Sequence, residues 1–453
     1  NLYSDFVDNK PPFIYLFYLI SQFIPGEDIR AVHILTTVLI IPLIAFFTSL
    51  TIKKINRTAG LLAGLFYIVF TSAYIPTDML ATNCEIIMIL FASTGFLFLI
   101  QNTNIGYFLY GIFISLATLS KQHAAIWILV PMISSLLLKD NNTIKKLLLS
   151  LTGFFIPFLF CMFYFYANGN LDNFIYFTIG HNIGYSKNPV LVSEIFKRFI
   201  KYLLPFLIII SPLIFFYLKS RKNTDKLTRS IFEPTLILSI FMIFIGFRFF
   251  PHYFIQSVYP LSILAACYFA NPEQKKISIR FIIAYSVVLT ILFNSYTFIY
   301  YSKKTDFIEE TEPLLRSIPG MLKEEGYCSN KNRYLFIWGY APLFYYYFYK
   351  ECSMLPASRF VLPQASTAGY IPGNESQLKG SFDFEKYIIK EHRRLLIEDL
   401  MNKNPQIIID TSKSNFHNWK RYTIDKFPEL NKFISENYLL YRNTGGFDIY
   451  VRK

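Results

Sequence analysis

The sequence predicts a polytopic α-helical membrane protein with a water-soluble α/β domain at its C-terminal end. Apolar residues make up 53% of the 453 residues, with 48 Phe and 33 Tyr, and the mean hydropathy is +0.36. This is more apolar mass than a soluble domain needs. We therefore expect an outward first loop and interfacial helix over residues 1–28, transmembrane helices over 29–302 and an extracytoplasmic α/β domain over 303–453.

Apolar runs long enough to cross a bilayer, about 17–25 residues each, define the membrane part. The ten candidate spans are residues 29–52, 59–77, 84–101, 104–120, 123–139, 147–167, 199–218, 231–250, 253–270 and 277–300. Only Lys121 and Gln122 separate the fourth span from the fifth. Residues 11–25 are too short to cross and begin with two prolines, so we expect a helix lying in the interface.

The pattern changes after Tyr301. Short apolar runs, such as Tyr334–Trp338 and Gln406–Asp410, alternate with amphipathic stretches such as residues 385–401. Alternation of this kind is typical of an α/β domain. About 150 residues are enough for an independent core.

The distribution of Lys and Arg predicts which side of the membrane each loop faces. If residues 1–28 lie outside, 14 cations flank helix ends on the cytoplasmic side and 8 on the other, as the positive-inside rule favours. Ten crossings return the chain to the side where it started. The first loop and the C-terminal domain are therefore both expected to face outward.

The net charge of +14 follows from this topology. Nucleic-acid binding would require basic residues clustered on a folded surface, whereas these lie in short loops between apolar runs, so we expect no nucleic-acid partner. Five cysteines are too few for a disulfide scaffold. Cys328 and Cys352 share the soluble part, where they could either pair or remain free thiols.

The first loop carries the most concentrated polar chemistry. Asp5, Asp8 and Lys10 lie within six residues, and Pro11 and Pro12 restrict the backbone directly after them. Charge alone would favour a merely solvated loop.

Other polar residues border the same predicted face. Glu85 stands one turn into a span, where an ionisable group is expensive and often functional. Each of the others taken alone could be an interfacial anchor, but together they would form a mixed acidic and basic cavity suited to phosphate, with cations for a leaving group and a carboxylate for a proton. The remaining candidates are Asp78, Lys121, Gln122, His123, Arg248, His252 and Tyr253.

The run YSDFVDNKPPF at residues 3–13 resembles the first-loop signature of bacterial membrane glycosyltransferases of the protein-mannosyltransferase-like and aminoarabinose-transferase-like group, which have the GT-C fold. The resemblance extends through Glu85 to LSKQHA at 119–124, RFFPHYFIQSVYP at 248–260 and RYLFIWGYAPLFYYY at 333–347. It therefore covers nearly the whole chain.

The resemblance implies an inner-membrane enzyme that transfers a sugar, with inversion, from a polyprenyl-phosphate donor to an extracytoplasmic glycan, lipid or protein. Such a reaction would serve lipopolysaccharide modification or protein glycosylation. It also implies catalytic roles for Asp5, Asp8 and Glu85, and donor-phosphate contacts for the cations. Those contacts fall to Lys10, Lys121, Arg248 and His252, with Asp78, Gln122 and Tyr253 as additional candidates.

No cofactor is called for by the sequence. A divalent metal would find oxygen and nitrogen ligands in the carboxylates and in His181 and His252, but none has a diagnostic spacing. The sequence also departs from the group, whose members usually carry a first helix and an acidic residue or pair ahead of the KPP loop. We therefore expect the catalytic base to lie before residue 1.

Two other readings stay open. A transporter or flippase for a lipid-linked or polar substrate would also have many spans with scattered polar residues, although no internal repeat is visible and the outward domain has no obvious use there. A polysaccharide polymerase or ligase would be expected to keep its key residues in late outward loops.

Overall fold

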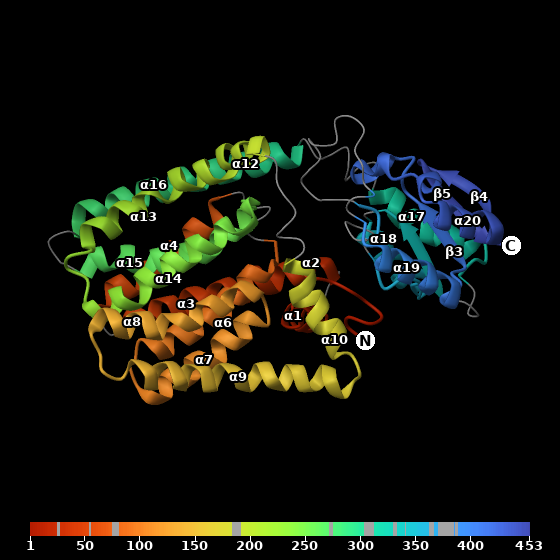
Figure 1. Cartoon of the computed structure of the whole chain (residues 1–453). Helices are drawn as coiled ribbons and strands as arrows, with labels where there is room; N and C mark the ends of the chain where they lie inside the picture. Colours follow the sequence, from red (N-terminus) through yellow and green to blue (C-terminus); the bar gives the residue numbers. More distant parts are fainter. Residues whose placement is uncertain are drawn as a thin grey trace. The chain divides into compact units, whose positions relative to one another are not determined.

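The computed structural model describes residues 1–24, 28–53, 56–74, 81–183, 192–270, 275–302, 312–328, 333–339, 341–361, 367–369, 385 and 388–453. The chain forms two compact units (Figure 1). One comprises Asn9–Tyr300, and the other comprises Asn1–Asp8 together with Tyr301–Lys453. The first loop, which is one continuous segment in the sequence, is thus divided between the two units at the Asp8–Asn9 peptide bond.

Helices are the only regular secondary structure in the described ranges of the membrane unit, and η marks short 3-10 or π segments. Its elements are α1 (Phe13–Ser21), α2 (Asp28–Ile34), η1 (Leu35–Ile40), α3 (Ile41–Lys53), α4 (Arg57–Ser72), α6 (Cys84–Leu99), α7 (Asn104–Thr118), η2 (Gln122–Leu129), α8 (Val130–Leu138), α9 (Thr143–Ala167), α10 (Leu171–Ile175), η3 (Tyr176–Gly180), α12 (Val192–Arg198), η4 (Phe199–Leu203), α13 (Leu204–Ser220), α14 (Lys226–Phe244), η5 (Ile245–Phe247), η6 (Pro251–Phe254), α15 (Ile255–Ala266), η7 (Cys267–Ala270) and α16 (Lys275–Ser302).

The membrane-spanning character of this unit is confirmed. Continuous helical stretches of 20 to 29 residues, long and apolar enough to cross a bilayer, are Ala31–Lys53, Thr143–Ala167, Val192–Ser220, Lys226–Phe247 and Pro251–Ala270. Shorter apolar helices are Arg57–Ser72, Cys84–Leu99, Asn104–Thr118 and Gln122–Leu138. With the 28-residue α16, a helix occupies each of the ten predicted spans, and the chain is a multi-pass membrane protein.

The doubtful boundary between the fourth and fifth spans proves to be real. Helix α7 ends at Thr118, and Lys121 has an extended backbone directly before η2. The short predicted segment after the prolines is helix α1, and its depth in the interface stays a prediction.

Close packing holds the helices together. A Cβ at Gly111 of α7 would lie 1.9 Å from the Ser150 carbonyl oxygen of α9, and one at Gly153 of α9 would lie 2.0 Å from the Phe108 carbonyl oxygen. Glycine at both positions lets the two backbones touch, as small residues do at membrane helix interfaces.

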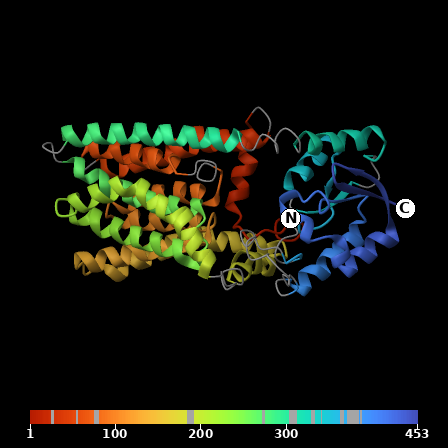
Figure 2. The same cartoon turned by 90° about the horizontal axis from the view of Figure 1, so that it is seen from above.

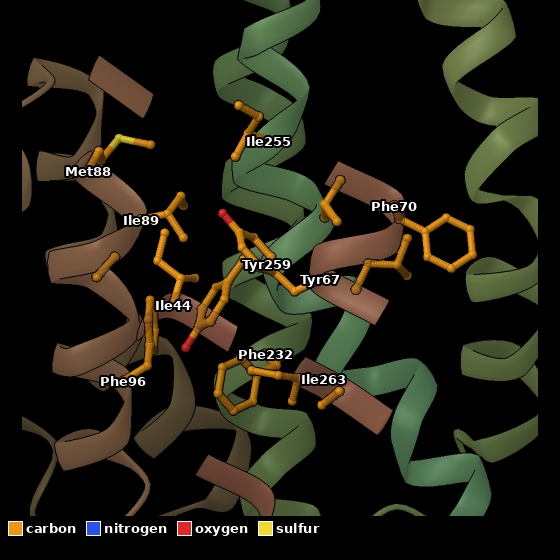
Figure 3. Close-up of a cluster of buried hydrophobic side chains, with 14 of the residues drawn as sticks. Ile44, Tyr67, Phe70, Met88, Ile89, Phe96, Phe232, Ile255, Tyr259 and Ile263 are labelled. Atoms are coloured by element: carbon orange, nitrogen blue, oxygen red, sulfur yellow. The ribbon is translucent and has the colours of Figure 1, made fainter. Parts of the chain in front are cut away.

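Aromatic side chains fill the centre of the bundle. Tyr67 of α4, Phe96 of α6 and Tyr259 of α15 are fully buried and lie near one another in Figure 3. Helix α16 joins this bundle through Tyr285, which stacks on Phe70 of α4 and donates a hydrogen bond to the Ile209 carbonyl of α13 at 3.1 Å; Figure 2 shows α16 from above.

The C-terminal unit contains a five-stranded mixed sheet in the order β2-β1-β3-β5-β4. Strands β1, β2 and β3 are parallel, whereas β5 runs antiparallel to both β3 and β4. Its elements are α17 (Glu312–Glu324), β1 (Tyr334–Trp338), α18 (Pro342–Cys352), β2 (Leu355–Pro356), α19 (Lys390–Lys403), β3 (Ile407–Asp410), η12 (Phe416–Arg421), η13 (Ile424–Lys426), α20 (Pro428–Asn437), β4 (Tyr438–Thr444) and β5 (Phe447–Arg452).

Helices cover both faces of this sheet, because alternate strand residues point to opposite faces. Phe336, Trp338 and Ile408 pack with α19 and α20 on one face. Leu335, Ile337, Ile407 and Ile409 pack with α17 and α18 on the other. The predicted α/β domain is therefore present.

A disulfide settles the alternative that the sequence left open. Cys328 and Cys352 are bonded, with their Cα atoms 5.1 Å apart, and they link the turn after α17 to the end of α18. The other three cysteines are buried in the membrane unit.

A buried carboxyl group at the end of β3 makes this unit sensitive to pH. Asp410 accepts hydrogen bonds from the Ser412 backbone N–H and hydroxyl, both at 2.9 Å. Burial, together with the nearby Asp448 carboxylate, raises the pKa of Asp410 to about 6. The folded state therefore binds this proton more tightly than the unfolded chain does.

We expect the stability contribution of Asp410 to be full below pH 4 and lost as the pH rises through 6. A shift of about two pKa units is worth about 3 kcal/mol, so the unfolding free energy of the unaltered protein should fall by about that amount between pH 4 and 7 relative to Asp410→Asn. Urea unfolding followed through the fluorescence of Trp338 and Trp419 would measure it. An equal difference at both pH values would contradict the assignment.

Candidate active site

The basic half of the first loop is fastened to the membrane unit. The Asn9 carbonyl accepts hydrogen bonds from Gln122 Nε2 at 2.9 Å and Asn182 Nδ2 at 2.7 Å. The Phe13 backbone N–H donates to the Leu119 carbonyl at 3.0 Å. Lys10 and the two prolines lie between these anchors, so the backbone that carries the exposed Lys10 is held at both ends.

A buried ion pair involves Lys121, which stands in the chain between Leu119 and Gln122, two residues that anchor this segment. Glu85, in the first turn of α6, is 2% exposed, and its Oε1 lies 2.8 Å from Lys121 Nζ. The Lys121 ammonium also lies 5.0 Å from the ring centre of Tyr253. A buried pair adds little net stability because both charges lose their hydration, and in a membrane protein such a pair is most often functional.

A break between α14 and α15 supplies a further cation, Arg248. Gly246 has a φ of +71°, and Phe247 and Phe249 have φ values of +50° and +47°. Left-handed backbone at non-glycine residues costs about 1–3 kcal/mol each and is concentrated at functional sites. Between the two phenylalanines, Arg248 is 2% exposed; Pro251 then starts η6.

Aromatic rings connect the break to the ion pair. The Tyr253 ring centre lies 4.9 Å from that of His252 and 6.1 Å from that of His123. Phe250 stacks on His252 at 5.7 Å, and the Arg198 guanidinium lies 5.6 Å from the Phe250 ring centre. Arg198 Nη1 also donates to the Arg248 carbonyl at 3.3 Å.

The assembled cluster is rich in positive charge. Lys121, Arg198 and Arg248 bring three cations, and Glu85 brings one carboxylate close to the imidazoles of His123 and His252. Buried cations of this kind stabilise phosphate oxygens strongly because water screens them little. Among the described residues, no group of three His, Cys, Asp or Glu side chains is arranged to hold a metal ion.

The structure gathers most of the candidate site residues in one unit. Six of them contribute to the cluster or anchor the loop beside it: Glu85, Lys121, Gln122, Arg248, His252 and Tyr253. Asp5 and Asp8 belong to the other unit, and Asp78 lies outside the described residues.

Sequence reasoning missed three contributors. Arg198 stands at the start of a predicted span, where an arginine is an ordinary anchor. Asn9 and Asn182 are uncharged and lie far apart in the chain, so nothing in the sequence pairs them. The KPP motif was the available signal for Asn9, which directly precedes it.

Comparison with solved structures identifies the architecture. The crystal structure of ArnT from Cupriavidus metallidurans, bound to undecaprenyl phosphate, superposes with a TM-score of 0.61 over 99% of this chain and 88% of that one. This chain has the GT-C fold. The sequence identity is 11%, so the likeness establishes the GT-C fold and not the reaction. No family model and no curated protein sequence matches the chain.

Proposed function

We propose that this chain is an integral-membrane glycosyltransferase that transfers a sugar from a polyprenyl-phosphate donor to an extracytoplasmic acceptor. The observation that carries the proposal is the buried Glu85–Lys121 pair, joined through Tyr253 to a break that carries Arg248. This cluster lies within the GT-C fold, and a similar structure, that of ArnT, was solved with undecaprenyl phosphate bound.

The chemistry of the cluster suits a phosphate leaving group. In the transfer, the bond between the anomeric carbon and the phosphate oxygen breaks, and polyprenyl phosphate departs with the electron pair. Lys121 and Arg248 would stabilise the negative charge that develops on that oxygen, with Lys10 approaching from the anchored loop. Glu85 would keep the Lys121 ammonium oriented.

A base must take the proton of the acceptor hydroxyl as the new glycosidic bond forms. We assign Asp5 and Asp8 the catalytic role of shaping the site around that base, as the resemblance implies. A hydroxyl that attacks opposite the departing phosphate inverts the anomeric carbon. The acceptor would be a cell-envelope glycan, a lipid or a protein.

Two observations support an extracytoplasmic site. The Cys328–Cys352 disulfide lies in the C-terminal unit, and disulfides persist mainly in oxidising compartments. The excess of Lys and Arg on the opposite loops favours the same orientation. The proposed location is the bacterial inner membrane, with the C-terminal domain outside the cytoplasm.

Lys10→Ala in the complete protein is expected to lower sugar transfer from a polyprenyl-phosphate donor by about tenfold or more, because a cation that meets the phosphate is lost. Transfer by protein purified in detergent, with a radiolabelled sugar donor, measures the effect. Lys53→Ala is the matched control, since Lys53 is an exposed lysine at the end of α3.

Undiminished turnover by Lys10→Ala would remove Lys10 from the site. If the protein moves a labelled lipid-linked sugar across vesicle membranes and transfers it to no acceptor, the protein is a flippase and the proposed glycosyltransferase function is wrong.

A further inference from the structure

The first loop changes its attachment within a single peptide bond. Residues 1–8 group with the C-terminal unit, whereas Asn9 groups with the membrane unit. On the membrane side, the Asn9 carbonyl is held by Gln122 and Asn182. The two attachments therefore belong to neighbouring residues of the chain, whose Cα atoms are about 3.8 Å apart.

On the other side of that bond, the acidic half of the loop is hydrogen-bonded to the C-terminal unit. The Val7 backbone N–H donates to the Arg359 carbonyl at 3.0 Å, and the Val7 side chain packs against the core that α19 and α20 form with the sheet. The Tyr3 N–H donates to the Phe6 carbonyl at 2.7 Å and tightens the loop. Val7, which lies between Asp5 and Asp8 in the chain, therefore attaches this part of the loop to the C-terminal unit.

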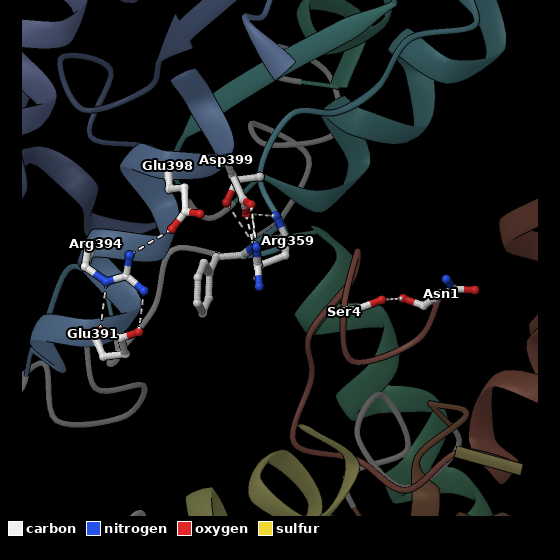
Figure 4. Close-up of polar contacts among 9 residues, drawn as sticks. Asn1, Ser4, Arg359, Glu391, Arg394, Glu398 and Asp399 are labelled. Carbon is white, nitrogen blue, oxygen red and sulfur yellow. Dashed lines mark hydrogen bonds and ion pairs between the residues drawn. The ribbon is translucent and has the colours of Figure 1, made fainter. Parts of the chain in front are cut away.

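Arg359 is itself locked in place by Asp399 of α19 (Figure 4). Its Nε and Nη2 donate to the carboxylate at 3.0 and 2.8 Å, and its backbone N–H donates to Oδ2 at 2.9 Å. The Asp399 side chain is 7% exposed. A bidentate pair at a nearly buried carboxylate defines both position and orientation, and it fixes the carbonyl that receives Val7.

A second arginine on α19 provides a contrast. Arg394 pairs with Glu391 and Glu398 at 2.7 and 2.9 Å, but all three side chains are at least 47% exposed. Exposed pairs contribute little. Figure 4 shows Arg394 with both glutamates, and the Arg359–Asp399 pair in the same view.

We infer that the Arg359–Asp399 ion pair is a positioning device for the transfer reaction, holding the loop that carries Asp5 and Asp8. This inference rests on the proposed function. Lys10 belongs to the membrane unit, while Asp5 and Asp8 belong to the C-terminal unit. Loss of the pair would displace these two carboxylates without disturbing the cations that meet the donor phosphate.

The test uses the complete protein in three variants. Asp399→Asn removes the charge that holds Arg359 but keeps the shape of the side chain. Val7→Pro removes the N–H donor of the loop and leaves the ion pair intact. Arg394→Gln breaks the exposed pairs on the same helix and serves as the control.

Two measurements separate a positioning role from a structural one. Hydrogen–deuterium exchange of the segment 1–8 should accelerate about tenfold in Asp399→Asn and Val7→Pro. The kcat for sugar transfer should fall about tenfold or more, since small displacements of a reacting group are costly, while the KM for the donor stays within about twofold. Arg394→Gln should change neither.

Full kcat in both test variants despite accelerated exchange would overturn the inference and leave the proposed function standing. Reduced kcat without accelerated exchange would also overturn it. If the unaltered protein transfers no sugar from a polyprenyl-phosphate donor, the proposed function fails and the inference falls with it.

Discussion

Exchanging Lys121 for methionine in the complete protein is expected to lower sugar transfer by about 100-fold or more. The ammonium lies 2.8 Å from Glu85 and against Tyr253, and one well-placed charge contact in a transition state is worth this factor. The substitution also leaves Glu85 buried without its cation, which should lower the unfolding free energy by about 3–5 kcal/mol. Transfer assays and thermal unfolding in detergent measure the two effects.

The double variant Glu85→Gln/Lys121→Met separates these effects. Without either charge, no uncompensated ion remains, so stability should return close to that of the unaltered protein. Transfer should stay low, because the cation is still missing. If transfer recovers together with stability, the pair is a structural feature and the phosphate contact must be sought at Arg248 or Lys10.

Alanine at Gly111 is expected to destabilise the membrane unit by about 3 kcal/mol, near the upper end for overpacked sites. The added methyl would lie 1.9 Å from the Ser150 carbonyl oxygen, and neither helix backbone can move aside without separating α7 from α9. Thermal unfolding of the purified protein measures the loss. The same effect is expected at Gly153, which makes the reciprocal contact with Phe108.

Gly320→Ala is the matched control, because Gly320 lies in α17 and has nothing within 4 Å of an added Cβ. There the substitution should be neutral or slightly stabilising, since alanine favours helix. An unchanged unfolding temperature in Gly111→Ala would mean that the α7–α9 approach is looser than the structure has it.

Properties that depend on neighbouring residues in the chain were predictable from the sequence. The length of an apolar run decides whether a segment can cross a bilayer, so the ten spans could be placed, including the boundary at Lys121. The same holds for β1 and β3, which are short apolar runs. The order of the sheet was not predictable, because β5 pairs with β3 across some forty residues of intervening chain.

In the candidate site, too, single residues were predictable from their local sequence, whereas their contacts with residues distant in the chain were not. Glu85, Lys121 and His252 could be proposed because each is a polar residue at the end of an apolar span. Their convergence depends on Tyr253, whose ring contacts the lysine and the histidine. Arg198 could not be proposed, because its neighbour Arg248 lies fifty residues further on.

The first loop shows most clearly what the sequence alone could not predict. Asp5, Asp8 and Lys10 form one motif in the sequence, and nothing local indicates that the motif is shared between two units. The division arises from a hydrogen bond between Val7 and Arg359, which are separated by 352 residues. A contact of this range leaves no trace in composition or periodicity.

The left-handed phenylalanines beside Arg248 have a consequence for engineering. Phe247 is 47% exposed, so glycine there would relax its backbone while giving up little packing. A screen that rewards heat resistance alone would therefore converge on this position. The variants it selects would make the backbone beside Arg248 less constrained. Gains in melting temperature would then come with losses in turnover.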